Sequence, residues 1–287
     1  MNNRVPFIIE YTEGSCTAGG VKGAVGFAAA DVLRADKDTV SRLSRLYGEV
    51  ESEDKRREAA ELLSSIAWLG EAARSADARL MRSMIDEMIC FRVYMRYFLT
   101  KCRQEGESGA QSFSLFEAKL PELESALRKE NMIARTVMPK ELSPKIRFAA
   151  SEGAIREICE FSSLGELLIF DFMRALSLGT APRICPSCGR YFLPERSNRL
   201  YCGGVADDGR LCREVGAGRA HSERVRNDSL GKVCAAACGR INTRKCRGKL
   251  TAQEADALKK QCRDLLSAAQ QTGVSCETFE QQLRAIV

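Results

Sequence analysis

Apolar residues recur at intervals of three and four between residues 38 and 103, which is the period of an amphipathic helix. Leu62, Ile66 and Leu69 form one such set, and charged residues fill the positions between them. A stripe of methionine and aromatic residues follows along residues 81–98. Such a stripe could line a ligand groove, but methionine side chains more often fill gaps in a core. The pattern therefore predicts helices whose methionine stripe is buried.

Two further elements are expected before the cysteine-rich region. A helix is predicted over residues 114–129, and a short extended segment over residues 155–161. Ser163 and Glu166 then form a capping box, in which each side chain can bond the backbone of the other. This box predicts the start of an apolar helix that leads directly into the cysteines.

The C-terminal part has the helical pattern again. Residues 213–227 and 230–247 are each predicted to form a helix. Thr251 opens a second capping box, and Ser275 can cap a last helix. We therefore expect the tail to be helical throughout.

The first residues have a different pattern, with a β-prone run at residues 5–11 and a glycine-rich stretch at residues 14–23. A phosphate-binding loop requires Gly-Lys-Ser/Thr, whereas Lys22 is followed by Gly23 and lacks the neighbouring hydroxyl that binds magnesium. A flexible loop or turn is therefore expected here in place of a nucleotide site.

The composition of the chain limits the classes of protein to which it can belong. A chain of 287 residues with 45% hydrophobic residues can bury a sizeable core. Thirteen cysteines are an odd number, and no N-terminal stretch has the pattern of a secretory signal, so a secreted disulfide scaffold is not expected. The apolar runs are far shorter than the roughly 20 residues that cross a bilayer. We expect a cytoplasmic protein without a membrane segment.

Four cysteines have the spacing of a metal site. Two residues separate Cys185 from Cys188, thirteen separate Cys188 from Cys202, and nine separate Cys202 from Cys212. Thiolate is the preferred ligand of structural zinc, and a C-x-x-C turn presents two sulfurs to one tetrahedral ion while a second loop supplies the others. Four sulfur ligands leave no open position for water or substrate. One structural zinc ion is therefore expected.

The residues around these cysteines predict a small module. Gly189 can adopt the positive φ that closes a turn after Cys188. The β-prone pairs at residues 191–192 and 200–201 are expected to form a hairpin, and Cys212 is expected at the start of a helix, where the dipole favours a thiolate. Knuckle, hairpin and helix together are typical of a treble-clef-like finger.

The fold class predicted from these patterns is mainly α. A helical N-terminal domain is followed by the small treble-clef-like zinc module and a helical C-terminal tail. The predicted segments are a β and glycine-rich N-terminal segment (1–30), a helical domain (31–180), the zinc-finger module (181–228) and the helical tail (229–287).

Two other ligand sets stay open. A second zinc site could combine His221, the only histidine, with three cysteines of the tail: Cys234, Cys238 and Cys246. Alternatively, His221 could replace Cys212 as the fourth ligand of the first site, because Cys3His sites also exist. The competing interpretation is that these cysteines are core residues and that the histidine is a surface or packing residue.

Basic residues are concentrated around and after the cysteine motif. Residues 183–249 contain 15 Lys and Arg and 6 Asp and Glu, a balance of +9, so the rest of the chain sums to −3 within the total of +6. Guanidinium groups suit phosphate because they form two parallel hydrogen bonds. The candidate contacts to DNA or RNA are Arg190, Arg196, Arg199, Arg213, Arg219, Arg224, Arg240, Arg244 and Arg247.

The cysteine motif and the basic residues bear on three candidate functions. A nucleic-acid-binding regulator accounts for the arginines, and Tyr191 and Tyr201 could stack on bases or simply pack beneath the metal. A scaffold protein is the alternative, with a protein partner on the helical N-terminal domain. Salt separates the two, because phosphate contacts weaken steeply with ionic strength and an apolar interface does not. An enzyme is not expected, because a closed sulfur site and a single histidine offer little catalytic chemistry.

The cysteine-rich region resembles an uncharacterised family of bacterial proteins, a domain of unknown function, through the run RICPSCGRYFLPERSNRLYC and its continuation LCREVGAGRAHSERVRND. That family's pattern is C-P-x-C-G-x-Y-F, then Y-C, then C-x-x-x-G-A opening a helix. The matching residues after the first two cysteines are Tyr191, Phe192, Tyr201, Cys202, Cys212, Gly216 and Ala217. The runs RKCRGKLTAQE and SCETFEQQLRAI extend the resemblance into the tail. It supports the four metal ligands and implies no activity.

More distantly, the finger is similar to the CGNR-type zinc fingers of bacterial regulators, which are thought to bind DNA. Here Cys212-Arg-Glu-Val stands in place of that signature, and a nine-residue insert precedes it. This second similarity implies that the module binds DNA.

Overall fold

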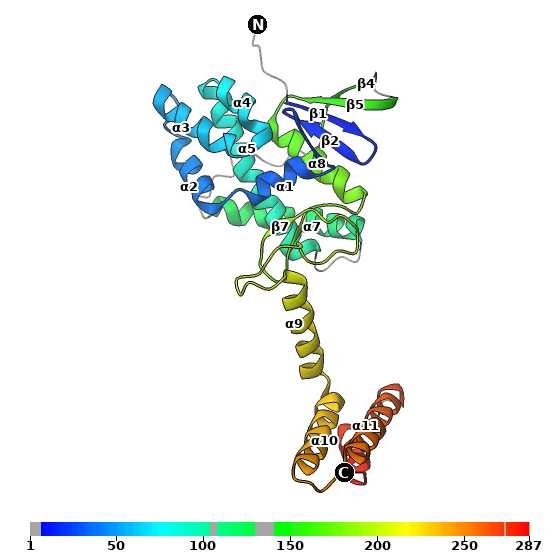
Figure 1. The fold of residues 1–287 in the computed structure, drawn as a ribbon. Coiled ribbons are helices and arrows are strands. Elements are labelled where there is room, and N and C mark those ends of the chain that lie inside the picture. The colour runs from blue at the N-terminus through cyan, green and yellow to red at the C-terminus, as the bar shows by residue number, and fades with distance from the viewer. Residues whose placement is uncertain (1–6, 104–107, 130–140, 152, 273, 287) are drawn as a thin grey trace. The chain divides into compact units, whose positions relative to one another are not determined.

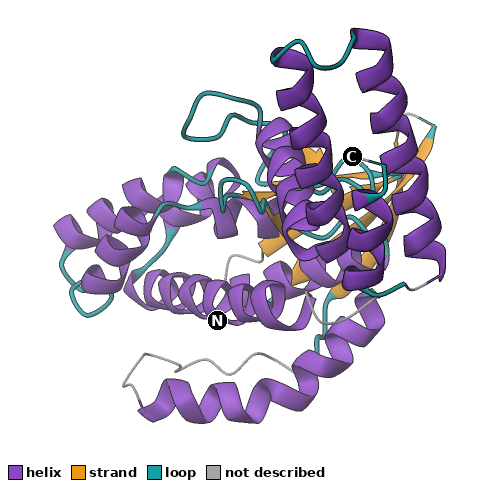
Figure 2. Cartoon of the chain, turned by 90° about the horizontal axis from the view of Figure 1, so that it is seen from below, coloured by secondary structure: helices purple, strands orange, loops and turns teal. Residues whose placement is uncertain are grey.

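The computed structural model describes residues 7–103, 108–129, 141–151, 153–272 and 274–286, and helices predominate in it (Figures 1 and 2). The chain divides into two compact units, Met1–Cys212 and Arg213–Val287. This division is coarser than the four predicted segments, and each unit has its own core. No helix within the described ranges has the length and apolarity that crossing a membrane requires.

The first unit contains most of the predicted helices. They are α1 (Phe27–Arg34), α2 (Lys37–Leu46), α3 (Glu53–Ser64), α4 (Gly70–Ser75), α5 (Ala78–Tyr97), α7 (Gly109–Lys129) and α8 (Leu164–Ser177). A π-helical turn, η2 (Phe98–Cys102), continues α5. The helical prediction for residues 38–103 is confirmed, and α7 begins five residues before the predicted start at residue 114.

An antiparallel sheet of five strands completes this unit. The strands are β1 (Phe7–Thr12), β2 (Ser15–Ala18), β3 (Val21–Ala24), β4 (Lys145–Ser151) and β5 (Ala154–Phe161), in the order β3-β2-β1-β5-β4. Ile9 of β1 lies opposite Ala18 of β2 on one side and Cys159 of β5 on the other. The sheet therefore joins the first predicted segment of the chain to the second.

The flexible loop or turn predicted for residues 14–23 is correct only at Gly14 and at residues 19–20, which are turns, because the other residues form β2 and β3. Gly14 and Gly20 have φ values of +73° and +75°, which glycine adopts without steric cost. At Gly19, a Cβ atom would lie 2.0 Å from the carbonyl oxygen of Trp68. The glycines thus allow two tight turns and a close approach to a neighbouring helix. The glycine-rich composition alone indicates only a flexible segment.

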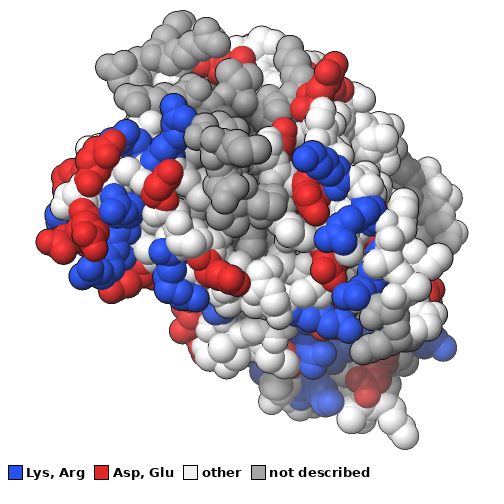
Figure 3. All heavy atoms as spheres, turned by 90° about the horizontal axis from the view of Figure 1, so that it is seen from above, with Lys and Arg blue, Asp and Glu red and all other residues white. Residues whose placement is uncertain are grey.

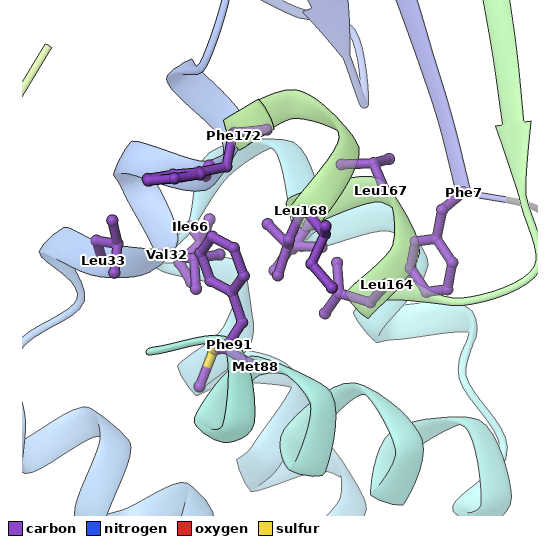
Figure 4. Close-up of a cluster of buried hydrophobic side chains, with 14 of the residues drawn as sticks. Phe7, Val32, Leu33, Ile66, Met88, Phe91, Leu164, Leu167, Leu168 and Phe172 are labelled. Carbon is purple, nitrogen blue, oxygen red and sulfur yellow. The ribbon is translucent and has the colours of Figure 1, made fainter. Parts of the chain in front are cut away.

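Helix α8 forms the centre of the core, in contact with β1 and β5 of the sheet and with α1 and α5. Figure 4 shows Leu164, Leu167 and Leu168 of this helix between Phe7 of the sheet and Phe91 of α5. The burial predicted for the methionine stripe is confirmed. Its buried members are Met81, Met84, Met88, Phe91, Met95 and Phe98.

Asp171 of α8 caps another helix. Its carboxylate, on a residue with no exposed surface, accepts hydrogen bonds from the backbone N–H of Gly26 at 2.8 Å and of Ala29 at 3.1 Å. The hydroxyl of Tyr11 donates a third bond at 3.1 Å. Gly26 is the N-cap of α1 and has no side chain, so the cap comes from a residue far away in the sequence.

We expect Asp171→Ala to lower the free energy of unfolding by about 3 kcal/mol, because it leaves two buried amides and a phenol without their acceptor. Asp171→Asn keeps one acceptor oxygen and should lose less. Denaturant titration measures both variants, with Asp38→Ala as a control on an exposed residue. Equal stability of Asp171→Ala and the control would show that this carboxylate does not hold α1.

The second unit is all-helical, and three of its helices, α10, α11 and α12, form a bundle. Helix α9 (Cys212–Asn227) begins at the last residue of the first unit, and α10 (Ser229–Cys246), α11 (Ala252–Thr272) and α12 (Cys276–Arg284) follow. The bundle has a core of its own, made of Cys234, Ala237, Ile241, Ala255, Cys262, Ala269, Phe279 and Leu283. The prediction of a helical tail is confirmed.

The predicted capping signals are present. The N–H of Glu254 donates to the Thr251 hydroxyl at 3.3 Å, and the N–H of Thr251 donates to the Glu254 carboxylate at 2.7 Å. Ser275 accepts from the N–H of Thr278 at 3.2 Å. At α8, Ser163 caps the N–H of Glu166. Local sequence therefore determines where these three helices begin.

Candidate metal centre

A short antiparallel pair of strands, β6 (Arg183–Ile184) and β7 (Tyr191–Phe192), frames the turn that carries Cys185 and Cys188. Within the turn, the N–H of Cys185 donates to Arg190 O at 2.9 Å and the N–H of Gly189 donates to Cys185 O at 2.8 Å. Gly189 has φ +70°, as its predicted role in the turn requires. This geometry is a compact knuckle that presents the two sulfurs together.

The predicted hairpin between residues 191–192 and 200–201 is wrong. The partner of β7 is β6, on the other side of the knuckle, and Leu200 is 60% exposed. Side-chain bonds hold the returning loop instead, since Arg183 donates to Arg199 O at 3.0 Å and to Ser197 O at 2.6 Å. The knuckle turn brings β6 and β7 together across a short loop. Closing a short loop costs less conformational entropy than closing the longer loop to residues 200–201, so the local pairing forms.

The other two cysteines come from the end of this loop. Cys202 precedes Gly203, whose φ is +70°, and the N–H of Cys212 donates to Gly204 O at 2.9 Å. Val205 and Leu211 form an isolated bridge that closes the intervening loop. Cys212 is the first residue of α9, as predicted.

The four sulfurs meet at one point. The Sγ atoms of Cys185, Cys188, Cys202 and Cys212 all lie within 4.8 Å of one another, and those of Cys188 and Cys202 are 3.6 Å apart. Zn–S bonds of about 2.3 Å place the sulfurs of a tetrahedral site about 3.8 Å apart. Cys185 and Cys212 are fully buried, and the other two are half-buried. These four cysteines could therefore hold a metal ion.

Arg190 sets the electrostatics of the cluster. Its Nε donates to the Cys188 sulfur at 3.3 Å, and another of its nitrogens donates to Val205 O. Burial disfavours the thiolate of Cys188, but hydrogen bonds from the side chain and backbone of Arg190 outweigh it and lower the pKa of this thiol to about 6. Burial and the neighbouring sulfurs raise the pKa of the Cys212 thiol to about 12. Arg190 therefore favours the thiolate form of Cys188, which is the form that binds a cation.

The aromatic residues of the module are packing residues. Phe192 and Tyr201 pack with Cys185 and Cys212 in a small core of their own. Tyr191 packs against the main core of the first unit. Of the two roles considered for Tyr191 and Tyr201, the described contacts favour packing over stacking on bases.

The model of a family of unknown function, DUF6076, matches residues 135–285. The chain belongs to this family. No curated protein and no solved structure matches it. The resemblance to an uncharacterised family is thereby confirmed, and the DUF6076 match includes β4, β5, α8, the cysteine cluster and the C-terminal helices.

The predicted arginines of this DUF6076 chain fall into two groups, and the first group acts within the module. The guanidinium of Arg190 donates hydrogen bonds to the Cys188 sulfur and to Val205 O. The Nε of Arg199 donates to Tyr201 O at 3.1 Å, and its guanidinium pairs with Glu195 at 2.7 Å. These two side chains brace the loops that carry the cysteines. Substituting them alters the module as well as its charge.

The second group is exposed. Arg196, Arg213 and Arg219 are exposed individually, and the side chain of Arg224 lies outside the described residues. The structure brings the remaining three predicted arginines to one hollow on the second unit, with a volume of about 690 Å³. It is lined by Arg240, Arg244, Arg247 and Arg284 together with Ala236, Gly239 and Thr243. We call this set the arginine hollow.

Arg284 was not a predicted site residue. It lies in the last turn of α12, which packs on α10, and it pairs with Glu280 at 2.9 Å. No carboxylate belongs to the described lining of the arginine hollow. Nothing local in the sequence indicates that α12 adds a fourth guanidinium, because the contact between α10 and α12 is a tertiary one.

The alternative ligand sets gain no support from the described residues. Among them, the only group of cysteine, histidine or acidic side chains close enough to hold a metal is the four-cysteine cluster, in which Cys212 occupies the fourth position. Cys234 belongs to the core of the second unit and donates to Cys262 O at 3.5 Å, whereas Cys246 is exposed. The side chain of His221 lies outside the described residues.

Proposed function

We propose that this chain is a nucleic-acid-binding regulator stabilised by one structural zinc ion. The observation that supports it best is the arginine hollow, in which four guanidinium groups from two helices face a shared space. Guanidinium groups bind phosphate through two parallel hydrogen bonds, and clustered positive charge attracts a polyanion.

The spacing of the hollow suits a phosphate backbone. Arg240 and Arg244 lie one turn apart on α10, Arg247 is the C-cap residue that follows this helix, and all three line the hollow. The other residues that line the hollow, Ala236, Gly239 and Thr243, have small side chains, and a Cβ atom at Gly239 would meet no atom within 4 Å. A nucleic-acid strand could therefore lie close to the helix while neighbouring arginines contact successive phosphates.

Zinc is the metal proposed for the cluster. Four sulfur ligands favour zinc among the divalent ions of the cell, and they fill every position of its tetrahedron. The role proposed for the ion is to hold the knuckle, the returning loop and the first turn of α9 in a treble-clef-like module. The proposed function is thus binding without catalysis.

The proposal is tested by the salt dependence of binding. With four phosphate contacts, the logarithm of the association constant should fall with the logarithm of salt concentration with a slope of about −3 to −4. Fluorescence anisotropy with single-stranded and duplex DNA and RNA of mixed sequence measures this slope and also ranks the four ligands. A flat salt dependence, or no binding of any ligand at about 50 mM salt, would contradict nucleic-acid binding.

A protein-interaction role is the second candidate, and exposed apolar residues on the sheet favour it. Ile146 and Phe148 of the edge strand β4 are 47% and 70% exposed, and Ile155 of β5 is 73% exposed. Apolar side chains on an edge strand are typical of a surface that pairs with another protein. Binding to a protein at this surface would be insensitive to salt, which separates it from the first candidate.

A further inference from the structure

A second hollow lies entirely within the first unit, beside the cysteine cluster. Its volume is about 1060 Å³, and its walls come from the end of α1, the start of α2, one face of α5 and the knuckle. Five cationic side chains line it, namely Arg34, Lys37, Arg92, Arg96 and Arg190. We call it the knuckle groove.

The charge of the knuckle groove is nearly all of one sign. Asp36 is the single acidic residue in its described lining, and this carboxylate already caps α2 by accepting from the N–H of Thr39 at 2.7 Å. On the face of the molecule shown in Figure 3, by contrast, basic and acidic side chains are intermingled. A concave surface lined by one sign of charge concentrates ions of the opposite sign.

Arg92 is the most deeply placed of these cations. It is half-buried and donates through Nη1 to the carbonyl oxygens of Val32 and Leu33, at the end of α1. Desolvation lowers the pKa of this guanidinium, and the charge of nearby Asp36 opposes that shift without forming an ion pair with Arg92. A half-buried cation with no direct ion pair favours the binding of an anion next to it.

Of the other cations that line the groove, some are held in place by hydrogen bonds and others are available to bind a ligand. Arg34 donates to Tyr191 O at 3.2 Å and pairs with Asp31, so its guanidinium is positioned at the wall. Arg96 and Lys37 are exposed, and neither forms an ion pair with any described residue. The knuckle groove thus combines positioned guanidinium groups with two cations that can close on a ligand.

The remaining wall is apolar. Val40 of α2, Ile89 and Val93 of α5 and Phe192 of the knuckle line the groove, and the volume is close to the 300–1000 Å³ of typical small-molecule sites. An apolar wall beside a cationic one matches a ligand with an organic body and a strongly charged end. Phosphate is the group that arginine clusters recognise best.

We propose that the knuckle groove binds a small organic phosphate, with the phosphate at Arg92, Arg96 and Lys37 and the organic part against α5. Cys202 and Gly204 also line the groove, so the cysteine cluster forms part of its wall. The site is separate from the arginine hollow and does not rest on nucleic-acid binding.

Calorimetric titration of the full chain with ATP, inorganic pyrophosphate and adenosine tests the proposal. ATP and pyrophosphate are expected to bind, and adenosine to bind far more weakly. The double variant Lys37→Ala, Arg96→Ala should lose affinity for ATP by about tenfold or more, because it removes two charge-assisted contacts. The control Arg45→Ala removes an exposed charge from α2 outside the groove and should change the affinity less than about twofold.

The outcomes are distinct. The proposal is overturned if neither phosphate binds, or if the double variant and Arg45→Ala lose affinity equally. It is also overturned if Lys37 and Arg96 are needed for oligonucleotides while ATP and pyrophosphate do not bind, which would assign the groove to nucleic acid. Substituting Arg240, Arg244 and Arg247 should leave ATP binding unchanged, so failure at the arginine hollow and failure at the knuckle groove can be told apart.

Discussion

Replacing Cys185 with alanine is expected to abolish stoichiometric metal binding and to unfold the cysteine module. Cys185 is fully buried, and its sulfur lies within 4.8 Å of the other three. The free energy of binding structural zinc is about 10–16 kcal/mol in small fingers and is also folding free energy, so the loss of one of four ligands removes a large part of it. Metal analysis of the purified protein and limited proteolysis of residues 183–212 measure the two effects.

A matched cysteine variant separates this effect from a general loss of thiol. Cys246 is exposed and lies outside the cluster, so Cys246→Ala should retain one equivalent of zinc and resist proteolysis like the parent chain. Acidification should release the metal from the parent chain, because protons compete with it for the sulfurs. One equivalent of zinc in Cys185→Ala, or none in the parent chain, would contradict the proposed site.

Replacing Arg240, Arg244 and Arg247 together with alanine is expected to weaken nucleic-acid binding on the order of 10²- to 10³-fold at about 0.1 M salt. The salt slope should decrease by about three, one for each phosphate contact that is lost. All three side chains are exposed, so the thermal unfolding of the second unit should change little. Fluorescence anisotropy across a range of salt concentrations measures both the affinity and the slope.

A variant of equal charge provides the control. Lys232, Lys260 and Arg263 are exposed on the second unit and do not line the arginine hollow. Their joint replacement by alanine removes the same charge and should reduce affinity far less, because long-range attraction alone is screened by salt. Equal losses in the two triple variants would show that net charge binds the nucleic acid and that the hollow has no special role.

The elements that the sequence predicts well are those with local causes. The capping box at Thr251 is complete, and at α8 the Ser163 hydroxyl caps the N–H of Glu166 while the Glu166 carboxylate accepts from the N–H of Ser162. The methionine stripe of α5 is buried for a similar reason, since the helical period alone decides which face meets the core. The four cysteines also converge as their spacing predicts, because a tight turn and one loop bring them together.

The elements that it predicts poorly depend on distant partners. The extended segments predicted at residues 5–11 and 155–161 overlap β1 and β5, but the pairing of Phe7 with Phe161 has no local signal, and β2 and β3 are too short to show an alternating pattern. The same holds for Arg284, which reaches the arginine hollow through the packing of α12 on α10. Charge counted along the chain also does not distinguish Arg199, which braces a loop, from Arg196, which is exposed.

Helix α1 is stabilised at both ends by other helices. Asp171 of α8 accepts from its first amides, and Arg92 of α5 donates to its last carbonyls. Its eight residues are fewer than the roughly 12–15 that an isolated helix needs in water. We therefore expect this segment to become helical only when α5 and α8 pack around it. Because α1 contacts both helices, the folding of α1, α5 and α8 is expected to be one cooperative step.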